Sequence, residues 1–201
     1  MFRGVTGLLL WLLLIGTANA TAPKILILGD SLSAAYGIAQ ADGWVALLQT
    51  RLHDDGFPHQ VINASISGET TRGGLTRLPK LLLENHPMLV VIALGGNDGL
   101  RGTPLTVMQD QLVAMIDLAQ AANAQILLIG NRLPPNYGEA YSDAFQAVFT
   151  DLAKQYALPL VPFMLEAIAT DDTLLQDDRL HPTAAAQPIL RDRIGAVVET
   201  L

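Results

Sequence analysis

The residue types that together perform acyl transfer occur in two short segments near the ends of the chain. Ser31 lies in a Gly-Asp-Ser turn directly after the apolar run Lys24–Leu28, and Asp178 precedes His181 by three residues. A serine hydroxyl attacks a carbonyl when a base removes its proton, and a carboxylate holds the imidazole base in the required tautomer. The pattern predicts a nucleophile at Ser31, a general base and acid at His181, and an orienting carboxylate at Asp178.

Two further segments could stabilise the oxyanion that such a reaction forms. Gly68 lies in Ser-Ile-Ser-Gly-Glu-Thr, and Asn97 lies in Gly-Gly-Asn-Asp-Gly. Glycine lets a backbone N–H approach a substrate closely, and an asparagine amide is a neutral donor that needs no counter-ion. We predict an oxyanion hole made of the Ser31 and Gly68 N–H groups and the Asn97 side chain.

Each of these segments also has a structural explanation. Gly-Asp-Ser is a common turn, in which Asp or Ser can cap a helix, and the glycine-rich segments could serve backbone conformation alone. The chain has no Gly-x-Ser-x-Gly elbow. A metal site built on Asp178 and His181 lacks further ligands at suitable spacing, so we expect no metal. The other histidines are expected to be solvated loop residues: His53, His59 and His86.

The first twenty residues have the features of a cleaved signal peptide. Arg3 is their only charge, an apolar run covers residues 8–15, and Ala18-Asn19-Ala20 offers small residues for a signal peptidase. The run is short for a membrane span, which needs roughly 20 apolar residues, although an uncleaved anchor is the alternative. We expect cleavage after Ala20 and a periplasmic or secreted protein.

Cleavage leaves 181 of the 201 residues, a suitable length for one domain spanning residues 21–201. The removed peptide carries one positive charge, so the formal charge changes from −7 to −8. This charge disfavours binding to nucleic acid or to anionic membrane surfaces. The chain has no cysteine, so neither disulfides nor thiolate metal sites stabilise it.

Apolar runs alternate with helical patterns along the chain. Three of the runs are continuously apolar, as strands are when both faces of a parallel sheet are covered. Alternating β and α elements with short links predict a three-layer α/β/α sandwich. The expected strands are Lys24–Leu28, Gln60–Asn63, Met88–Leu94, Gln125–Ile129 and Pro159–Val161, and the expected helices are Gly43–His53, Thr71–Glu84, Pro104–Ala121, Glu139–Tyr156 and Thr183–Glu199. The Asn97 segment is expected to be a turn after the third strand.

Four separated blocks make the chain resemble the SGNH hydrolases, also called the GDSL esterase/lipase superfamily. They are Gly-Asp-Ser-Leu at Ser31, Gly68, Gly-Asn-Asp at Asn97, and Asp178-x-x-His181. Longer segments are similar to the bacterial periplasmic thioesterase I, lysophospholipase and arylesterase group, among them Arg-Leu-Pro-Pro-Asn-Tyr-Gly from residue 132. The likeness runs from about residue 24 to the C-terminal helix. One departure is Ala35, where that group leads us to expect glycine.

The resemblance implies a flavodoxin-like sheet of order 2-1-3-4-5, an open acyl-binding groove and no cofactor. It also implies small-molecule substrates: aryl and short- to medium-chain acyl esters, acyl thioesters and, for some members of the group, lysophospholipids. The segment after the asparagine block is associated in that group with acyl-chain preference. Our candidates for the substrate groove are Asp98, Gly99, Leu100, Leu105, Met108, Pro134 and Tyr137.

Two other functions remain open from the sequence. The same superfamily contains carbohydrate O-acetylesterases, although only Trp44 remains among the tryptophans after signal removal and an aromatic sugar platform is not apparent. A module of a different class would bind a small ligand at the strand ends without turnover, since fold alone does not determine function. Neither phosphate-binding glycine motif is present, which disfavours nucleotides. Nothing in the sequence requires more than a monomer.

Overall fold

The computed structural model describes residues 22–201, so the expected signal peptide lies outside the described part. The sheet consists of five parallel strands in the order β2-β1-β3-β4-β5, which confirms the expected α/β architecture and strand order. The strands are β1 (Lys24–Gly29), β2 (Gln60–Asn63), β3 (Leu89–Ala93), β4 (Gln125–Ile129) and β5 (Leu160–Val161). Within residues 22–201, no helix is long and apolar enough to cross a bilayer.

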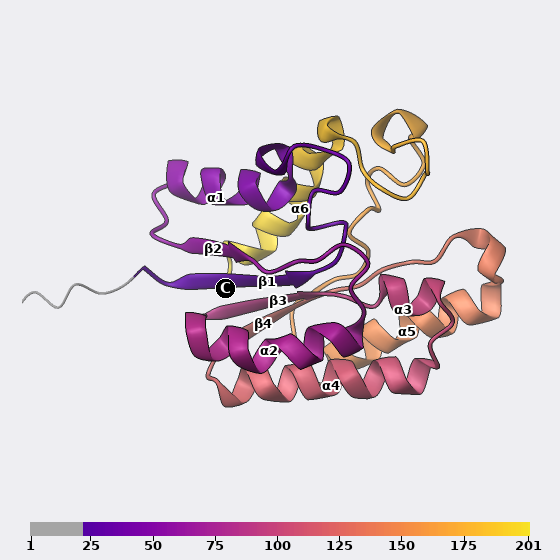
Figure 1. Ribbon diagram of the computed structural model, residues 1–201, viewed down its shortest axis with the longest axis horizontal. Coiled ribbons are helices and arrows are strands. Elements are labelled where there is room, and N and C mark those ends of the chain that lie inside the picture. The colour runs from indigo at the N-terminus through magenta and orange to yellow at the C-terminus, as the bar shows by residue number, and fades with distance from the viewer. Residues whose placement is uncertain (1–21) are drawn as a thin grey trace, which may run out of the picture.

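Helices cover both faces of the sheet. In Figure 1, α1 and α6 lie on one side of the strands, and α2, α4 and α5 lie on the other. The α-helices are α1 (Trp44–Asp54), α2 (Thr71–Asn85), α3 (Gly96–Leu100), α4 (Leu105–Ala121), α5 (Glu139–Gln155) and α6 (Gln187–Val198). Short 3₁₀ helices occupy Gln40–Asp42, Pro135–Tyr137, Asp172–Leu174 and Ala184–Ala186.

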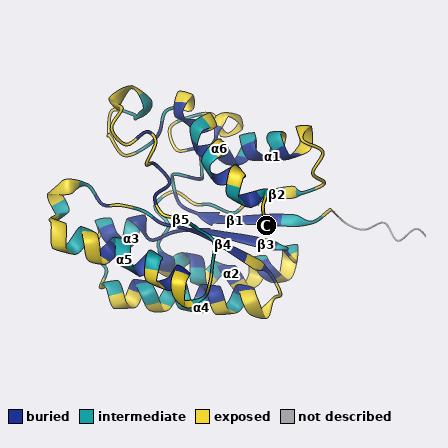
Figure 2. Cartoon of the chain, turned by 180° about the vertical axis from the view of Figure 1, so that it is seen from behind, coloured by how far each residue is buried: buried dark blue, intermediate teal, exposed yellow. Residues whose placement is uncertain are grey.

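The alternation of side chains along each strand divides the core into two layers. Ile25 and Ile27 of β1 pack in the layer with α1 and α6, whereas Leu26 and Leu28 pack in the layer with α2, α4 and α5. All four are at most 2% exposed, which explains why the strand is continuously apolar. Figure 2 shows the buried strands between helices whose outer faces are exposed.

The helices follow the predicted apolar patterns with small differences at their ends. In α4, apolar residues at helical spacing form one buried face, including Met108, Leu112 and Met115. The expected C-terminal helix is divided, because a 3₁₀ turn precedes α6 and Pro188 lies at the start of that helix. The segment at Asn97, expected to be a turn, is instead the short helix α3. Its five residues include two glycines and a single large apolar side chain, so the sequence shows no helical apolar period there.

Because all strands are parallel, the loops that follow them meet at one edge of the sheet. The loops after β1, β2 and β3 carry Ser31, Gly68 and Asn97, respectively. Strand β1, which precedes Ser31, lies between β2 and β3 in the sheet, so these three loops are neighbours. The fold therefore gathers most of the predicted site from local segments that each begin where a strand ends.

Candidate active site

The loop after β1 holds Ser31 in a tight turn. The Asp30 carbonyl accepts the N–H groups of Ser33 and Ala34, at 3.1 and 2.9 Å, and the Asp30 carboxylate accepts the N–H of Leu32 at 3.0 Å. A Cβ at Gly29 would come within 2.8 Å of the Ser33 hydroxyl, so the turn needs glycine there. These bonds fix the backbone on both sides of Ser31.

A second turn, near the C-terminus, holds the acid and the base. Leu175 and Pro182 form an antiparallel bridge, so residues 175–182 make a short hairpin. At its tip, one Asp178 oxygen accepts the N–H groups of Leu180 and His181 at 2.9 and 3.0 Å. The spacing of three residues between Asp178 and His181 is thus the spacing of a carboxylate-capped turn.

The two turns meet and bring three predicted residues into one hydrogen-bonded line. His181 Nδ1 lies 2.6 Å from the second Asp178 oxygen, and His181 Nε2 lies 2.8 Å from Ser31 Oγ. Burial raises the pKa of Asp178, but the hydrogen bonds from His181 and Leu180 outweigh it and lower this pKa to about 2. Asp178 is therefore ionised at neutral pH, and Nδ1 of His181 carries a proton toward it, which leaves Nε2 free to accept the Ser31 proton.

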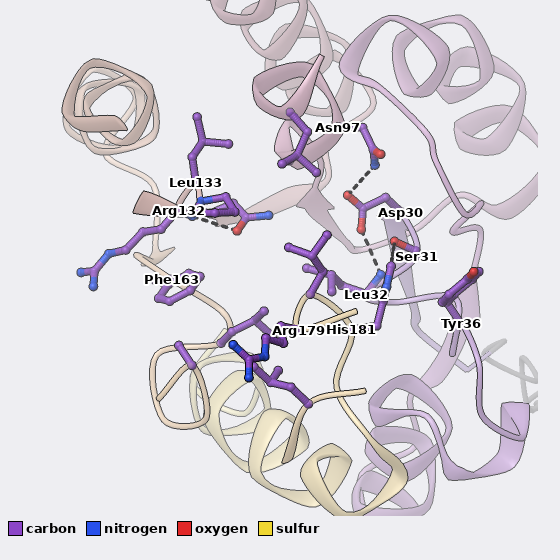
Figure 3. Close-up of a pocket in the computed structure, with 18 of the residues that line it drawn as sticks. Asp30, Ser31, Leu32, Tyr36, Asn97, Arg132, Leu133, Phe163, Arg179 and His181 are labelled. Atoms are coloured by element: carbon purple, nitrogen blue, oxygen red, sulfur yellow. Dashed lines mark hydrogen bonds between the residues drawn. The ribbon is translucent and has the colours of Figure 1, made fainter. Parts of the chain in front are cut away.

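Gly68 and Asn97 lie beside Ser31 on the same pocket. Gly68 adopts a φ of +78°, a conformation that favours glycine. Asn97 Nδ2 donates to the Asp30 carboxylate at 3.1 Å and to the Glu69 carbonyl at 3.0 Å. Both partners are acceptors, so the amide can only be oriented with its nitrogen toward Asp30. Figure 3 shows Asn97, Asp30 and Ser31 together at one side of the pocket.

Asp30 is a carboxylate of the site that sequence reasoning treated only as a turn or cap residue. It is 4% exposed and lines the pocket, and no basic side chain among residues 22–201 donates a hydrogen bond to it. Burial raises the pKa of Asp30 to about 6, while the Leu32 N–H, the charge of His181 and the Asn97 amide lower it in part. An ionised carboxylate thus lies next to the nucleophile at a cost in free energy.

Two polar contacts connect the segments that carry Gly68 and Asn97. Asp98 is 2% exposed and accepts the N–H and the hydroxyl of Thr71, at 2.8 and 2.7 Å, at the start of α2. Arg101 donates to the Gly68 carbonyl at 3.0 Å. The segment that follows Asn97 is therefore joined to the start of α2 through Asp98 and to the loop after β2 through Arg101. Neither contact could be found from a local pattern.

The pocket has a volume of about 680 Å³ and is mostly apolar beyond Ser31. In Figure 3, Arg132, Leu133 and Phe163 lie across the pocket from Ser31. The volume suits a small-molecule ligand. Its apolar lining consists of Leu32, Leu100, Leu133, Pro134, Pro135, Phe163, Leu165, Ala169, Leu175 and Leu180.

Of the seven groove candidates, Leu100 and Pro134 line this pocket and the others do not. Tyr137 instead donates its hydroxyl to the Leu100 carbonyl at 3.0 Å, behind the pocket wall. Asp98 bonds Thr71, as described above. The remaining three, Gly99, Leu105 and Met108, pack in or against the core layer of α4 and α5. The apolar wall comes mainly from the segments after β4 and β5, because those loops lie opposite Ser31.

No group of three or more histidine, cysteine or acidic side chains in residues 22–201 is arranged to hold a metal ion. His53 has an 84% exposed side chain at the end of α1, and His86 is exposed at the end of α2. His59 is only half-buried. None of these three lines the pocket.

Comparisons with known proteins agree with this geometry. The model of the GDSL-like lipase/acylhydrolase family matches residues 27–188. The chain is 49% identical to esterase TesA of Pseudomonas aeruginosa over 185 residues, 92% of each chain. It is 42% identical to thioesterase 1/protease 1/lysophospholipase L1 of Escherichia coli strain K12 over 192 residues, 96% of this chain and 91% of that protein.

Solved structures give the same result. A crystal structure of TesA superposes with a TM-score of 0.86 at 48% identity, covering 88% of this chain and 98% of that one. The psychrotrophic esterase EstA from Pseudoalteromonas sp., inhibited by monoethylphosphonate, superposes with a TM-score of 0.85 at 46% identity, covering 88% and 97%. These matches confirm the resemblance inferred from the four blocks: the chain belongs to the GDSL-like lipase/acylhydrolase family, the SGNH hydrolases.

Proposed function

We propose that this protein hydrolyses carboxylic esters and acyl thioesters through an acyl-enzyme formed on Ser31. That it is an ester-bond hydrolase follows from its family and its esterase and thioesterase relatives. The observation that carries the residue assignment is the line from Asp178 through His181 to Ser31, with contacts of 2.6 and 2.8 Å. A nucleophile, a base and an orienting carboxylate within hydrogen-bond reach are what covalent acyl transfer needs.

In the acylation step, Ser31 Oγ attacks the carbonyl carbon of the substrate while His181 Nε2 takes the hydroxyl proton. Asp178 keeps Nδ1 protonated and stabilises the imidazolium. The tetrahedral intermediate collapses as His181 returns the proton to the leaving alcohol or thiol. Water then attacks the acyl-enzyme by the same route, and the Ser31 proton is restored as the carboxylic acid leaves.

The negative oxygen of the intermediate would lie among the N–H groups of Ser31 and Gly68 and the amide of Asn97. One such donor is typically worth a hundred- to a thousandfold in rate, about 3–4 kcal/mol. In the resting site both Asn97 N–H groups already have acceptors. An oxyanion must therefore share one of those N–H groups, and the carboxylate of Asp30 keeps the amide nitrogen turned to that side.

The pocket favours an acyl or aryl group over a sugar. Its wall is formed by leucine, proline and phenylalanine side chains, and Trp44 is 1% exposed in the core and does not face the pocket. We therefore propose aryl and short- to medium-chain acyl groups as the acids of the substrate, with lysophospholipids a further possibility suggested by the name of the E. coli relative. The O-acetylesterase alternative lacks a supporting contact.

We also propose that the protein is exported by the signal peptide of residues 1–20 and acts as a monomer in the periplasm or outside the cell. The three small residues that end at Ala20 support cleavage there. Mass spectrometry of the protein recovered from the periplasm tests it, since an N-terminus at Thr21 is the expected result. Gel filtration of that material tests the monomer.

Initial rates on p-nitrophenyl esters from acetate to palmitate, and on matched acyl thioesters, test the proposed activity. Ser31→Ala should lose nearly all turnover and remain folded, whereas Ser142→Ala on α5, outside the pocket, should match the wild type. A fluorophosphonate probe should label Ser31 alone, as a phosphonate inhibits the relative EstA. Unlabelled, inactive wild-type protein that is folded would favour a binding module instead.

A further inference from the structure

Apart from His181 itself, the side chain of Gln176 joins the hairpin that carries Asp178 and His181 to the Ser31 loop by hydrogen bonding. Gln176 lies at the base of the hairpin, where its backbone N–H donates to the His181 carbonyl at 2.7 Å. Its side-chain Nε2 donates within the hairpin to the Pro182 carbonyl at 3.0 Å and outside the hairpin to the Tyr36 carbonyl at 2.8 Å. Residues 36 and 176 are 140 positions apart in the chain.

Tyr36 is in turn bonded to the nucleophile's own backbone. Its N–H donates to the Ser31 carbonyl at 3.3 Å, and its ring lies 4.3 Å from the His181 ring, centroid to centroid. The contacts close a ring: Ser31 to His181, His181 to Gln176 through the hairpin, Gln176 to Tyr36, and Tyr36 back to Ser31. Of these contacts, only the hydrogen bond between Ser31 and His181 takes part in the proposed proton transfer.

The loop is shaped to admit the Gln176 amide. A Cβ on Gly37 would lie 2.2 Å from Gln176 Oε1, so only glycine leaves the space, and Gly37 has a φ of +74°. Ala35 nearby has a φ of +57°, which L-residues rarely adopt. Both partners of Nε2 are carbonyl oxygens, so the orientation of the amide is fixed. A strained backbone persists only where the surrounding structure holds it, so the contact between this loop and the Gln176 amide is a defined feature of the fold.

We propose that Gln176 is a positioning residue for the reaction: its amide fixes the His181 hairpin against the Ser31 loop and so sets the distance between Ser31 Oγ and His181 Nε2. The inference rests on the proposed function of Ser31 and His181. Gln176 does not line the pocket, so it acts on the alignment of the proton transfer and not on substrate binding. Small displacements of reacting groups cost up to about a hundredfold in rate.

Two variants of nearly the same size test the proposal. Gln176→Glu replaces the donor by an acceptor that faces two carbonyl oxygens, and Gln176→Met removes the hydrogen bonds without adding charge. Gln120→Glu, on the exposed side of α4, is the matched control for the added charge. Rates on a p-nitrophenyl ester are divided by the number of active sites that a fluorophosphonate titrates to completion, so that unfolded protein does not contribute.

We expect kcat per titrated site to fall at least tenfold in both Gln176 variants, with KM within twofold of the wild type and the rate of fluorophosphonate labelling reduced by the same factor as kcat. Gln120→Glu should match the wild type. If either folded Gln176 variant keeps wild-type kcat and labelling rate, even with a lower melting temperature, Gln176 is only a structural contact and the proposal is refuted. If the wild type itself neither turns over esters nor is labelled, the proposed function fails instead.

Discussion

Replacing Asp30 by asparagine should make the protein more stable and less active at neutral pH. The substitution keeps the size of the side chain but removes a charge that is 4% exposed and has no basic hydrogen-bond partner. It also replaces an obligatory acceptor for Asn97 by an amide that can present either its oxygen or its nitrogen. The buried Asp30 carboxylate thus lowers the stability of the folded protein and at the same time fixes the orientation of the Asn97 amide.

The magnitude follows from the pKa of Asp30. Burial raises it from 3.8 to about 6, which corresponds to about 3 kcal/mol. The folded protein binds the Asp30 proton more tightly than the unfolded chain does, so protonation of Asp30 stabilises the folded protein. This contribution is fully present below pH 3.8 and is lost as the pH rises through about 6. Between pH 4.5 and pH 8 the wild type should lose about 2 kcal/mol relative to Asp30→Asn, which has no such titration.

Urea denaturation at several pH values measures this difference directly. Comparing the pH dependence of the two proteins cancels the contribution of titrating groups that do not interact with Asp30. Asp143→Asn, an exposed position on α5, controls for the loss of one negative charge.

On p-nitrophenyl esters at pH 8 we expect kcat of Asp30→Asn to fall about tenfold, because the imidazolium of His181 loses a nearby negative charge and the Asn97 amide is held less firmly.

Two results would refute this reasoning. Parallel stability curves for Asp30→Asn and the wild type from pH 4.5 to pH 8 would mean that Asp30 carries no buried charge in the folded protein. Equal kcat values at pH 8 would mean that the carboxylate does not support the oxyanion donor or the imidazolium. The two measurements are independent, so they test the effect of Asp30 on stability and its effect on the rate separately.

Three further substitutions test the packing around the site. Gly99→Ala would place a Cβ 2.7 Å from the ring of Phe145 and should destabilise the fold by about 1–3 kcal/mol in urea titration. Ala35→Gly removes about 1–2 kcal/mol of strain in the left-handed backbone of the folded state. The greater conformational entropy of glycine in the unfolded chain offsets about 0.5–1 kcal/mol of this gain, so the melting temperature should rise slightly and kcat should not change. A lower melting temperature would contradict this expectation. Asp98→Ala leaves the N–H of Thr71 without its acceptor and should cost about 1–3 kcal/mol of unfolding free energy, measured in urea.

Much of the fold could be predicted because it depends on local patterns. Continuously apolar runs identified three of the five strands, and the helical spacing of Met108 and Leu112 is that of a helix face that is buried. The ends of elements were less certain, since capping and 3₁₀ turns depend on contacts outside the segment. The helix α3 was not predicted, because Gly-Asn-Asp-Gly-Leu carries turn residues and no apolar period.

The groove shows where local reasoning is insufficient. Asp98, Leu105 and Met108 follow the asparagine block and were reasonable candidates for a substrate wall. The structure places Asp98 against Thr71. The other two lie on α4 and pack in the core layer between that helix and the sheet. Which side of a short helix faces a pocket depends on the elements that pack against it, and these come from distant parts of the chain.

The amino-acid sequence by itself determined the types of residue and the local turns: a serine after a strand, and a carboxylate three residues before a histidine. It also indicated the α/β class, since three of the five strands are continuously apolar, as strands covered on both faces are. Only the tertiary structure decided that His181 Nε2 reaches Ser31 Oγ at 2.8 Å across 150 residues. It also decided that Asp30 is buried beside Asn97 and that Gln176 bonds Tyr36. These contacts join loops whose separation in space depends on how the helices pack on the sheet. The number of residues between two loops does not determine that separation.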